Sequence, residues 1–437
     1  PTIYNIIAYG ILCSAVTKEV VLINPKPHLS NLADRGTPSG LLSVAAETNR
    51  HSPDIKVTIV DEAFERIDYS QMQGALVGIT VMTPAAQRAK EIAQEAQKVG
   101  AYSVVFGGIH PTVCTQEMSN YGVVLKGEIE GGSWTQVLSD YRNGRSLLKT
   151  YYTPIVSLQK LPLASKYVYE YAQKSHMQQL SHARGCPMGC DYCTVHLVAG
   201  KAIRYRPLNE TLAELQRRNL LEGRKDLYAF FTCDNFGLKS PDLRLLEEIR
   251  QKLQGRDLDW FAQVGIGTLD NDKFLELANS VGHATLAVGL ESPFREGLVK
   301  VKKGIKGKDP ASVFEKVKKY PNIQTLVALM VGFDFEPREV FQQMLNFIKD
   351  IQPNGVYLSI LTPLPGTKTA RLLTDQGRIQ ETNWDYYDTR HLVFQARYSR
   401  GENQIGTWSK NSFLEGYTWL LDQIPSVLQK PISKPVR

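Results

Sequence analysis

Short apolar runs alternate with amphipathic stretches along the first third of this 437-residue chain. The runs are largely apolar rather than strictly alternating, which is typical of strands buried on both faces of a parallel sheet. In order, they are EVVLINP, KVTIVD, GALVGITVMTP, YSVVFGG and GVVLKGE. The stretches between them have the spacing of helices with one apolar face, as in AAQRAKEIAQEAQKVG. Residues 18–145 are therefore predicted to form a Rossmann-like (flavodoxin-like), doubly wound α/β domain.

The same alternation resumes after residues 146–177, which lack a clear period and are predicted to be a linker. The later strands are QQLSHAR, LYAFFTCDNF, LDWFAQVGIG, ATLAVGLES, TLVALMVGFDFE and GVYLSILTPLPGT. Six βα units in succession predict a partial (β/α)6 barrel over residues 178–375. Residues 376–437 begin with an aromatic and polar stretch and end in a helical pattern, so an α-rich C-terminal cap or tail is expected.

Composition and charge indicate where in the cell the protein is located and which kinds of partner it binds. Residues 1–17 are apolar, but they lack a basic n-region and are shorter than the roughly 20 residues that span a bilayer, so neither a signal peptide nor a transmembrane segment is predicted. Six cysteines, three of them crowded together, favour a reducing cytoplasm over a disulfide framework. The net charge of +7 is modest, and nothing indicates nucleic-acid binding. The lysines around residues 300–308 are expected to be a solvated face, with peripheral contact to a membrane or an anionic substrate as the alternative.

The clearest candidate functional site in the sequence is a loop with three cysteines, Cys186, Cys190 and Cys193, spaced C-x3-C-x2-C. Three thiolates without a nearby fourth would leave an open coordination position on a soft metal centre. A structural zinc site completed by His182 or His196 is one alternative, and three unrelated buried thiols are another. The loop follows the first predicted barrel strand, so it lies at the end of the barrel where parallel strands place their polar residues.

With an aromatic residue, Tyr192, before the last cysteine and a βα series after it, the loop resembles the signature of the radical S-adenosylmethionine (radical SAM) superfamily. The resemblance covers residues 178 to about 400. It implies that the three cysteines hold a [4Fe–4S] cluster and that the fourth iron binds S-adenosylmethionine. It also implies a flavodoxin- or ferredoxin-type reductant and a 5′-deoxyadenosyl radical as the reactive species.

The resemblance also suggests roles for residues at the strand ends. Tyr192 would lie near the adenine. The family usually contacts the methionine amino group through Gly-Gly-Glu, where this chain has Thr-Cys-Asp-Asn, so Asp234 is the favoured contact. Asp234 and Cys233 are the candidate catalytic residues, Cys233 because it is the spare thiol closest to the expected mouth. Helix capping is the alternative role for the polar residues at these ends. The S-adenosylmethionine contacts expected are Tyr192, Thr232, Asp234, Asn235, Gln263, Glu291, Ser292, Gly332 and Glu336.

The first domain, with its GITVMTP and GGIHPT turns, resembles the cobalamin-binding domain that precedes many radical SAM barrels. It lacks a D-x-H-x-x-G motif, so the resemblance implies cobalamin without a protein histidine from that motif on cobalt. A domain that binds nothing and only packs on the barrel is the alternative. The cobalamin contacts expected are Thr80, Thr83, Gly107, Gly108, His110 and Glu128.

Together these features favour a cobalamin-dependent radical SAM C-methyltransferase that acts at an unactivated carbon of a small molecule or peptide. Three stretches, CTVHLVAGKAIRYRP, VGFDFEPREVF and PLPGTKTARLLTDQGRI, resemble the branch acting on hopanoids and bacteriochlorophyll precursors. A radical SAM enzyme that forms or rearranges rings without methyl transfer is the alternative. tRNA methylthiolation would need a second cysteine triad in the first domain, where Cys13 and Cys114 are too few. A non-enzymatic sensor is a further alternative.

Overall fold

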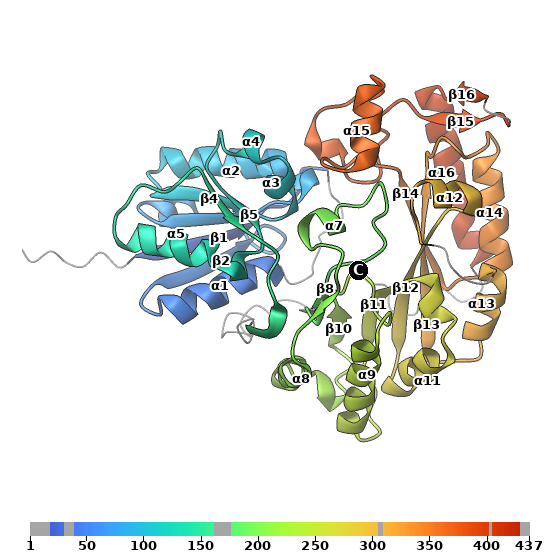
Figure 1. Cartoon of the computed structure of the whole chain (residues 1–437), viewed down its shortest axis with the longest axis horizontal. Coiled ribbons are helices and arrows are strands. Elements are labelled where there is room, and N and C mark those ends of the chain that lie inside the picture. The colour runs from blue at the N-terminus through green and yellow to red at the C-terminus, as the bar shows by residue number, and fades with distance from the viewer. Residues whose placement is uncertain (1–17, 30–38, 161–175, 305–308, 402–403, 429–437) are drawn as a thin grey trace, which may run out of the picture.

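The computed structural model describes residues 18–29, 39–160, 176–304, 309–401 and 404–428. The predicted N-terminal segment and residues 161–175 of the predicted linker lie outside these ranges. The described chain builds two six-stranded sheets in which every pairing is parallel (Figure 1). The prediction of an α/β fold with parallel sheets is therefore confirmed.

The first sheet has the strand order β2-β1-β3-β4-β5-β6. Its apolar strands alternate their side chains between two helical layers: Val20 and Leu22 face α1 and α5, whereas Val21 and Ile23 face α2 (Figure 1). Both faces are thus covered, as the continuous apolar runs predicted. The strands are β1 (Glu19–Asn24), β2 (Lys56–Asp61), β3 (Leu76–Thr80), β4 (Ser103–Gly107), β5 (Val123–Gly127) and β6 (Thr150–Thr153). The helices are α1 (Ser39–His51), η1 (Tyr69–Met72), η2 (Thr83–Ala85), α2 (Ala86–Lys98), α3 (Ile109–Val113), α4 (Thr115–Met118), η3 (Ile129–Gly131) and α5 (Ser133–Arg142).

Strand β6 falls inside the segment that was predicted to be a linker. It pairs in parallel with β5, with Val124 opposite Thr150 and Gly127 opposite Thr153. The run TYYT is short and mixes aromatic with hydroxyl side chains, so it carries no apolar pattern of its own. The sheet therefore continues to Thr153, beyond the boundary that the sequence indicated.

The second sheet has the order β14-β13-β12-β11-β10-β7, with the strands in sequence order from one edge to the other. Its strands are β7 (Met177–Leu180), β10 (Tyr228–Phe231), β11 (Trp260–Val264), β12 (Ala284–Glu291), β13 (Ile323–Val331) and β14 (Gly355–Ile360). The helices are α8 (Leu208–Arg217), η5 (Leu220–Glu222), α9 (Ser240–Leu253), α10 (Ile266–Leu269), α11 (Asp272–Val281), α12 (Arg295–Lys300), α13 (Pro310–Val317) and α14 (Val340–Ile351). Figure 1 shows the short strand β8 (Ala183–Arg184) and α7 (Val195–Val198) between the two sheets. This part of the chain also includes η4 (Leu158–Lys160) and β9 (Arg204–Tyr205), which pairs with β8.

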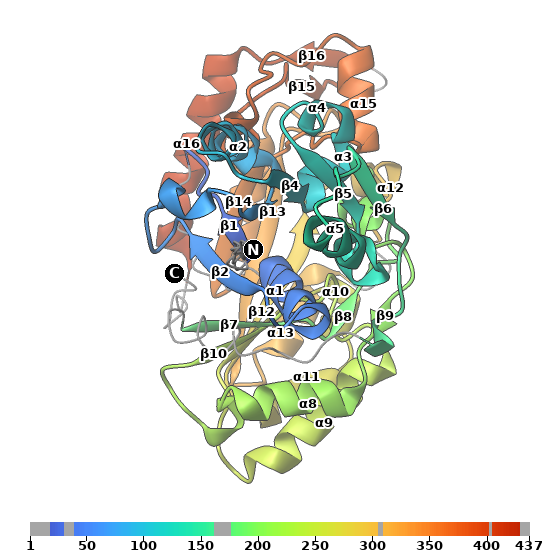
Figure 2. The same ribbon diagram turned by 90° about the vertical axis from the view of Figure 1, so that its left-hand side faces the viewer.

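Helix α15 (Lys368–Asp375) leads into the C-terminal segment. That segment combines η6 (Trp384–Tyr386), an antiparallel hairpin of β15 (Arg397–Ser399) and β16 (Ile405–Thr407), and the long helix α16 (Lys410–Val427). Helix α16 packs along α14, while η6 reaches back to α2 and η2 of the first sheet. Figure 2 shows α15 and the hairpin on the side of the molecule that carries α2 and α4. Within the described ranges, no helix combines the length and the apolar character needed to cross a membrane.

Candidate active site

The cysteine loop leaves and re-enters the barrel through the β8–β9 hairpin. Ala183 pairs with Tyr205, and Arg184 pairs with Arg204. Gly185 follows with a φ of +101°, and a Cβ atom there would lie 2.3 Å from the carbonyl oxygen of Ala202. Only glycine fits this close approach of two backbones. The sequence thus forces the chain to turn sharply just before the first cysteine.

The three thiols of the loop lie near one another, but their sulfur atoms are not spaced to bind a single metal ion. Cys190 is buried, and Cys186 and Cys193 are half-buried. Burial, together with a smaller effect of the neighbouring Cys190 and Cys186, raises the pKa of Cys193 to about 11, so the sulfurs are close enough to feel one another's charge. Among the described residues, His110, Cys114 and Glu117 bring three potential metal ligands within 4.8 Å of one another, whereas the three sulfurs of the loop do not form so compact a group. Zinc at about 2.3 Å from each sulfur would need a tighter set, whereas a larger iron–sulfur cluster fits thiolates that stand further apart.

Asp234, the favoured catalytic candidate, lies directly beside the loop. Its Oδ2 accepts a hydrogen bond of 2.7 Å from the backbone N–H of Gly185. Burial raises the pKa of the Asp234 carboxyl. Its contact with Gly185 makes Asp234 a positioning residue for the loop, and the same side chain, with Thr232, lines the cavity described below.

Three other residues at these strand ends have different surroundings. Cys233 belongs to the barrel core with 3% of its surface exposed, and burial raises the pKa of its thiol, which argues against the catalytic role expected for it. Asn235 accepts a hydrogen bond of 3.0 Å from the N–H of Gly265 and so joins two strand ends. Gln263 on β11 is exposed. Of these three, Gln263 alone presents its side chain openly at the strand ends.

Glu291 forms an ion pair near the cysteine loop. Its Oε1 lies 2.6 Å from Nζ of Lys303, and both side chains are largely buried. Glu291 has a φ of +68° at a bulge that ends β12, a strained conformation of the kind that clusters at functional sites. A Cβ atom on Gly289 would lie 2.9 Å from both charged atoms, so the glycine makes room for the pair. Burial raises the pKa of Cys190, and the ammonium of Lys303 offsets part of this effect.

The residues expected on the fifth strand form a closed network. Glu336 accepts hydrogen bonds from Ser292 Oγ (2.8 Å) and from the backbone N–H groups of Gly332 (2.8 Å) and Phe333 (3.1 Å). Burial raises the pKa of Glu336 to about 7. Glu336 therefore ties the ends of β12 and β13 together. Tyr192 packs edge-on against Phe333 with ring centroids 5.7 Å apart, so this network contacts the cysteine loop and supports it.

A cavity of about 380 Å³ lies between the first sheet and the cysteine loop. It opens at the carboxyl ends of β1, β3, β4 and β5, where ligands of doubly wound sheets bind. Four of the expected cobalamin contacts line it, namely Thr80, Gly107, Gly108 and Glu128. The first-domain side also includes Ser39, Gly40, Leu41, Gly78, Ile109, Gly127 and Trp134, and the barrel side includes Ser181, Arg184, Val198, Ala199, Thr232 and Asp234. Thr232 and Asp234 were expected as S-adenosylmethionine contacts, whereas the start of α1 and the other barrel residues of the lining were not predicted from the sequence.

Glycines hold the cavity open. A Cβ atom on Gly107 would meet no atom within 4 Å, and one on Gly78 would lie 2.7 Å from the Leu22 side chain. Gly108, with a φ of +107°, turns the chain so that Ile109 lines the cavity while His110 points away from it. The volume is in the range of cofactor sites. These features fit a bulky group inserted against the sheet, which is what part of a cobalamin requires.

Two expected cobalamin contacts are placed elsewhere. Thr83 is buried in η2 and is not among the residues that line the cavity. His110 is fully buried against Trp384, with ring centroids 5.1 Å apart. Burial lowers the pKa of His110 to about 4, so the ring is neutral near pH 7. His110 therefore lies outside the lining of this cavity, and its contact with the cofactor stays a prediction.

Glu128 joins the two halves of the protein. Its carboxylate receives two hydrogen bonds of 2.7 Å from the guanidinium of Arg204 in β9, and a third, of 3.1 Å, from the N–H of Val156. Arg184, next to the cysteine loop, pairs at 2.7 Å with Glu130. A contact between Glu128 and a corrin amide would compete with this pairing. We call the four residues Glu128, Glu130, Arg184 and Arg204 the interdomain ion-pair cluster.

Known proteins share this combination of loop and fold. Residues 180–348 match the Radical SAM superfamily. The barrel therefore contains a radical SAM domain.

Relatives extend the similarity over the first domain. The chain is 29% identical over 403 residues to the bacteriochlorophyllide d C-12(1)-methyltransferase of Chlorobaculum tepidum, covering 90% of this chain and 86% of the relative. It is 24% identical to the hopanoid C-2 methylase of Rhodopseudomonas palustris, over 82% and 69% of the two chains. Its fold is similar to that of the radical S-adenosylmethionine methyltransferase TsrM from Kitasatospora setae, solved with cobalamin and a [4Fe–4S] cluster (TM-score 0.65, 18% identity, 82% of this chain and 78% of that chain).

Proposed function

We propose that this protein is a cobalamin-dependent radical SAM C-methyltransferase. The observation that carries the proposal is a cavity that runs from the glycine-rich edge of the first sheet to Asp234, which is hydrogen-bonded at the start of the cysteine loop. A methyl carrier and a radical source must both reach the same substrate carbon. A cavity bordered by both candidate cofactor sites meets this requirement.

Each part of the site has a task that follows from its contacts. Cys186, Cys190 and Cys193 would hold a [4Fe–4S] cluster, and Asp234 fixes the loop that carries them. Gly107 and Gly108 would let part of a cobalamin lie against the sheet. When bound, the cluster with S-adenosylmethionine supplies a carbon-centred oxidant, and the cobalamin supplies the methyl group. The chain itself orients these groups and excludes water.

Methyl transfer is favoured over ring formation by the relatives. Those named for C-methylation of bacteriochlorophyllides and of a hopanoid match this chain over most of its length. They support a small-molecule substrate with an unactivated carbon. A low-potential reductant such as a flavodoxin or ferredoxin, and a cytoplasmic location, complete the proposal.

The test begins with full-length protein purified and reconstituted under anaerobic conditions. We expect a broad absorption band near roughly 400 nm from the cluster, and binding of added hydroxocobalamin. The Cys190→Ala variant is expected to lose the band and all 5′-deoxyadenosine formation. The matched control, Cys233→Ala, changes a buried thiol outside the loop and should keep the band.

Product analysis separates the two reactions. With S-adenosylmethionine, a reductant and a methyl-accepting substrate, methyl transfer yields 5′-deoxyadenosine and S-adenosylhomocysteine in equal amounts. A ring-forming enzyme yields 5′-deoxyadenosine without S-adenosylhomocysteine. Cluster-loaded protein that binds no corrinoid would contradict the proposal, as would turnover that yields only 5′-deoxyadenosine and methionine and no methylated product.

A further inference from the structure

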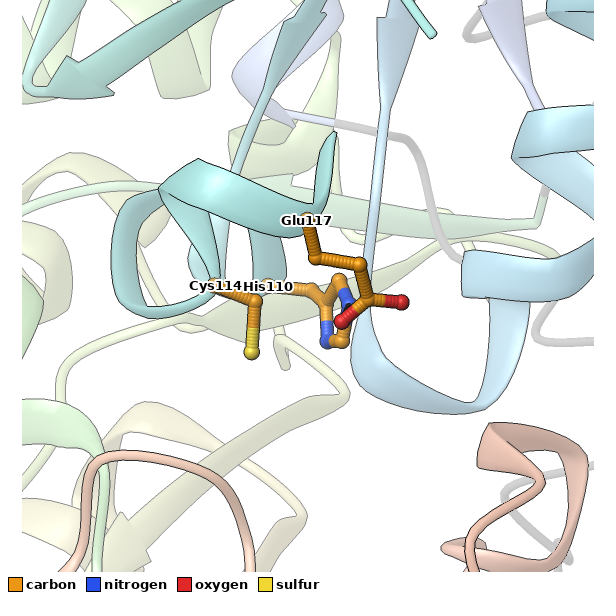
Figure 3. A group of neighbouring side chains, drawn as sticks. All are labelled: His110, Cys114 and Glu117. Atoms are coloured by element: carbon orange, nitrogen blue, oxygen red, sulfur yellow. Dashed lines mark ion pairs between the residues drawn. The ribbon is translucent and has the colours of Figure 1, made fainter. Parts of the chain in front are cut away.

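Three potential metal ligands meet on the side of α3 and α4 that faces away from the cavity. They are His110, Cys114 and Glu117, and one ligand atom from each lies within 4.8 Å of the others. Figure 3 shows the three side chains leaving one short helical stretch and gathering on the same side. Their spacing of four and then three residues brings them to one face of the helical path. This cluster is separate from the cysteine loop and from the proposed cobalamin cavity.

His110 is the most unusual member of the cluster. Its side chain has no exposed surface, and neither ring nitrogen has a hydrogen-bond partner. A buried polar atom without a partner costs free energy, so native structures almost always satisfy it. One face of the ring is covered by Trp384, which makes an edge contact without donating to either nitrogen. A ligand that accepts a lone pair from the ring would remove this cost.

Glu117 is held in an orientation that leaves one oxygen for such a ligand. Its Oε1 lies 2.6 Å from Nζ of Lys90 and accepts a hydrogen bond of 2.8 Å from Nε1 of Trp384. Its other oxygen, Oε2, faces Nε2 of His110 at 3.8 Å. Metal-binding carboxylates are commonly oriented by donors to the oxygen that does not bind the metal. The two donors come from different parts of the chain, α2 and η6, so the arrangement depends on the whole fold.

We propose that His110, Cys114 and Glu117 bind one zinc ion, with water as the fourth ligand. One nitrogen, one sulfur and one carboxylate oxygen are a donor set that zinc accepts in tetrahedral sites. Two ligand atoms at about 2.0 Å from zinc stand about 3.3 Å apart, so the 3.8 Å between His110 and Glu117 closes with a small side-chain shift. Binding converts the Cys114 thiol to a thiolate and releases its proton to solvent. The ammonium of Lys90 weakens the site, but its contact is with Oε1.

The zinc site would connect three parts of the protein. Ile109, the residue before His110, lines the cavity, and Trp384 belongs to the C-terminal segment that packs on the first domain. A bound ion would therefore fix the turn that forms one wall of the cavity and its contact with η6. This role is structural and does not depend on the proposed methyl transfer.

The experiment uses full-length protein whose cysteine loop already carries its iron–sulfur cluster, so that this loop does not take up zinc. After addition of zinc and gel filtration, elemental analysis should give one zinc per chain. Anomalous diffraction at the zinc edge should place the ion between His110, Cys114 and Glu117. Affinity is measured by competition with a chromogenic chelator under anaerobic conditions.

Variants separate this site from adventitious binding. Cys114→Ser and Glu117→Gln preserve side-chain size, and each should weaken zinc binding by more than roughly 100-fold because a ligand is lost. Trp384→Phe keeps the ring contact but removes the N–H donor to Glu117, so a loss of roughly 10- to 100-fold is expected. Cys233→Ala, the matched control at another buried thiol, should bind zinc like the unmodified chain.

Two results would overturn the proposal. One is cluster-loaded protein that binds less than a tenth of an equivalent of zinc at a free concentration of a few micromolar. The other is stoichiometric zinc whose affinity is unchanged in both Cys114→Ser and Glu117→Gln. Circular dichroism and the cluster absorption of each variant show whether it is folded. If a ligand variant does not fold, the zinc affinity of Trp384→Phe tests the proposal instead.

Discussion

Breaking the ion pair between Glu128 and Arg204 should destabilise the protein more than breaking an ordinary surface pair does. The side chains are 6% and 15% exposed, and the two hydrogen bonds between them are both 2.7 Å long. Replacing Glu128 with Gln leaves a largely buried guanidinium without its counter-charge. Removing one partner of a buried pair costs about 3–5 kcal/mol, and the slight exposure of Arg204 favours the lower end, about 3 kcal/mol.

A double-mutant cycle isolates this interaction. Glu128→Gln, Arg204→Met and the combined variant are compared by urea unfolding of the apoprotein, followed by tryptophan fluorescence. Because the combined variant leaves no buried charge unpaired, it should be less destabilised than the sum of the single variants, with a coupling of about 1.5–3 kcal/mol. Both single variants should also bind hydroxocobalamin more weakly, since Glu128 lines the cavity.

A second ion pair of the first domain is the matched control. Arg88 and Glu62 lie 2.7 Å apart, but they are 25% and 13% exposed and do not contact the barrel loop. Glu62→Gln should cost about 1 kcal/mol or less and leave cobalamin binding unchanged. The reasoning is refuted if the effects of Glu128→Gln and Arg204→Met add within about 0.5 kcal/mol, or if Glu62→Gln is equally damaging.

Three further predictions concern other parts of the site. Gly107→Val places a side chain in the open cavity, so it should weaken cobalamin binding by roughly 100-fold or more while the cluster absorption is unchanged; equal binding would contradict the assignment of the cavity. The raised pKa of Glu336, about 7 against 4.5, means that its contribution to stability is complete below about pH 4.5 and is lost as the pH rises through 7. Glu336→Gln should therefore remove a decrease of about 3 kcal/mol in unfolding free energy over that interval, and an unchanged pH profile by urea unfolding would disprove this. Lys303→Met removes a cation near the cysteine loop, so redox titration should show a cluster potential lower by about 40 mV, the equivalent of about 1 kcal/mol for one electron, whereas Lys303→Arg should keep the potential.

The sequence predicts what depends on local pattern and on short spacing. The apolar runs identify the strands because a parallel sheet buries both of their faces, and glycines such as Gly107 mark the cavity because a ligand needs close approach to the backbone. Strand β6 has no such pattern and is held by its pairing with β5. The sequence does not show that Ile109 lines the cavity and His110 does not, because the positive φ of Gly108 decides which of the next two side chains enters it. The spacing of His110, Cys114 and Glu117 was visible in the sequence, but their common face is defined only by the fold.

The contacts of the β8–β9 hairpin explain how two cofactor sites on separate sheets can be held in one geometry. On its barrel side, the hairpin is held by Asp234, which binds the N–H of Gly185 directly before the first cysteine. On its other side, Arg184 and Arg204 reach the carboxylates at the end of the first sheet. None of these partners is a neighbour in sequence, so pattern analysis of either domain alone does not reveal them. Because one short hairpin carries both sets of contacts, a shift of the first sheet must also move the cysteine loop. The interdomain ion-pair cluster therefore helps to hold the two candidate cofactor sites at one distance.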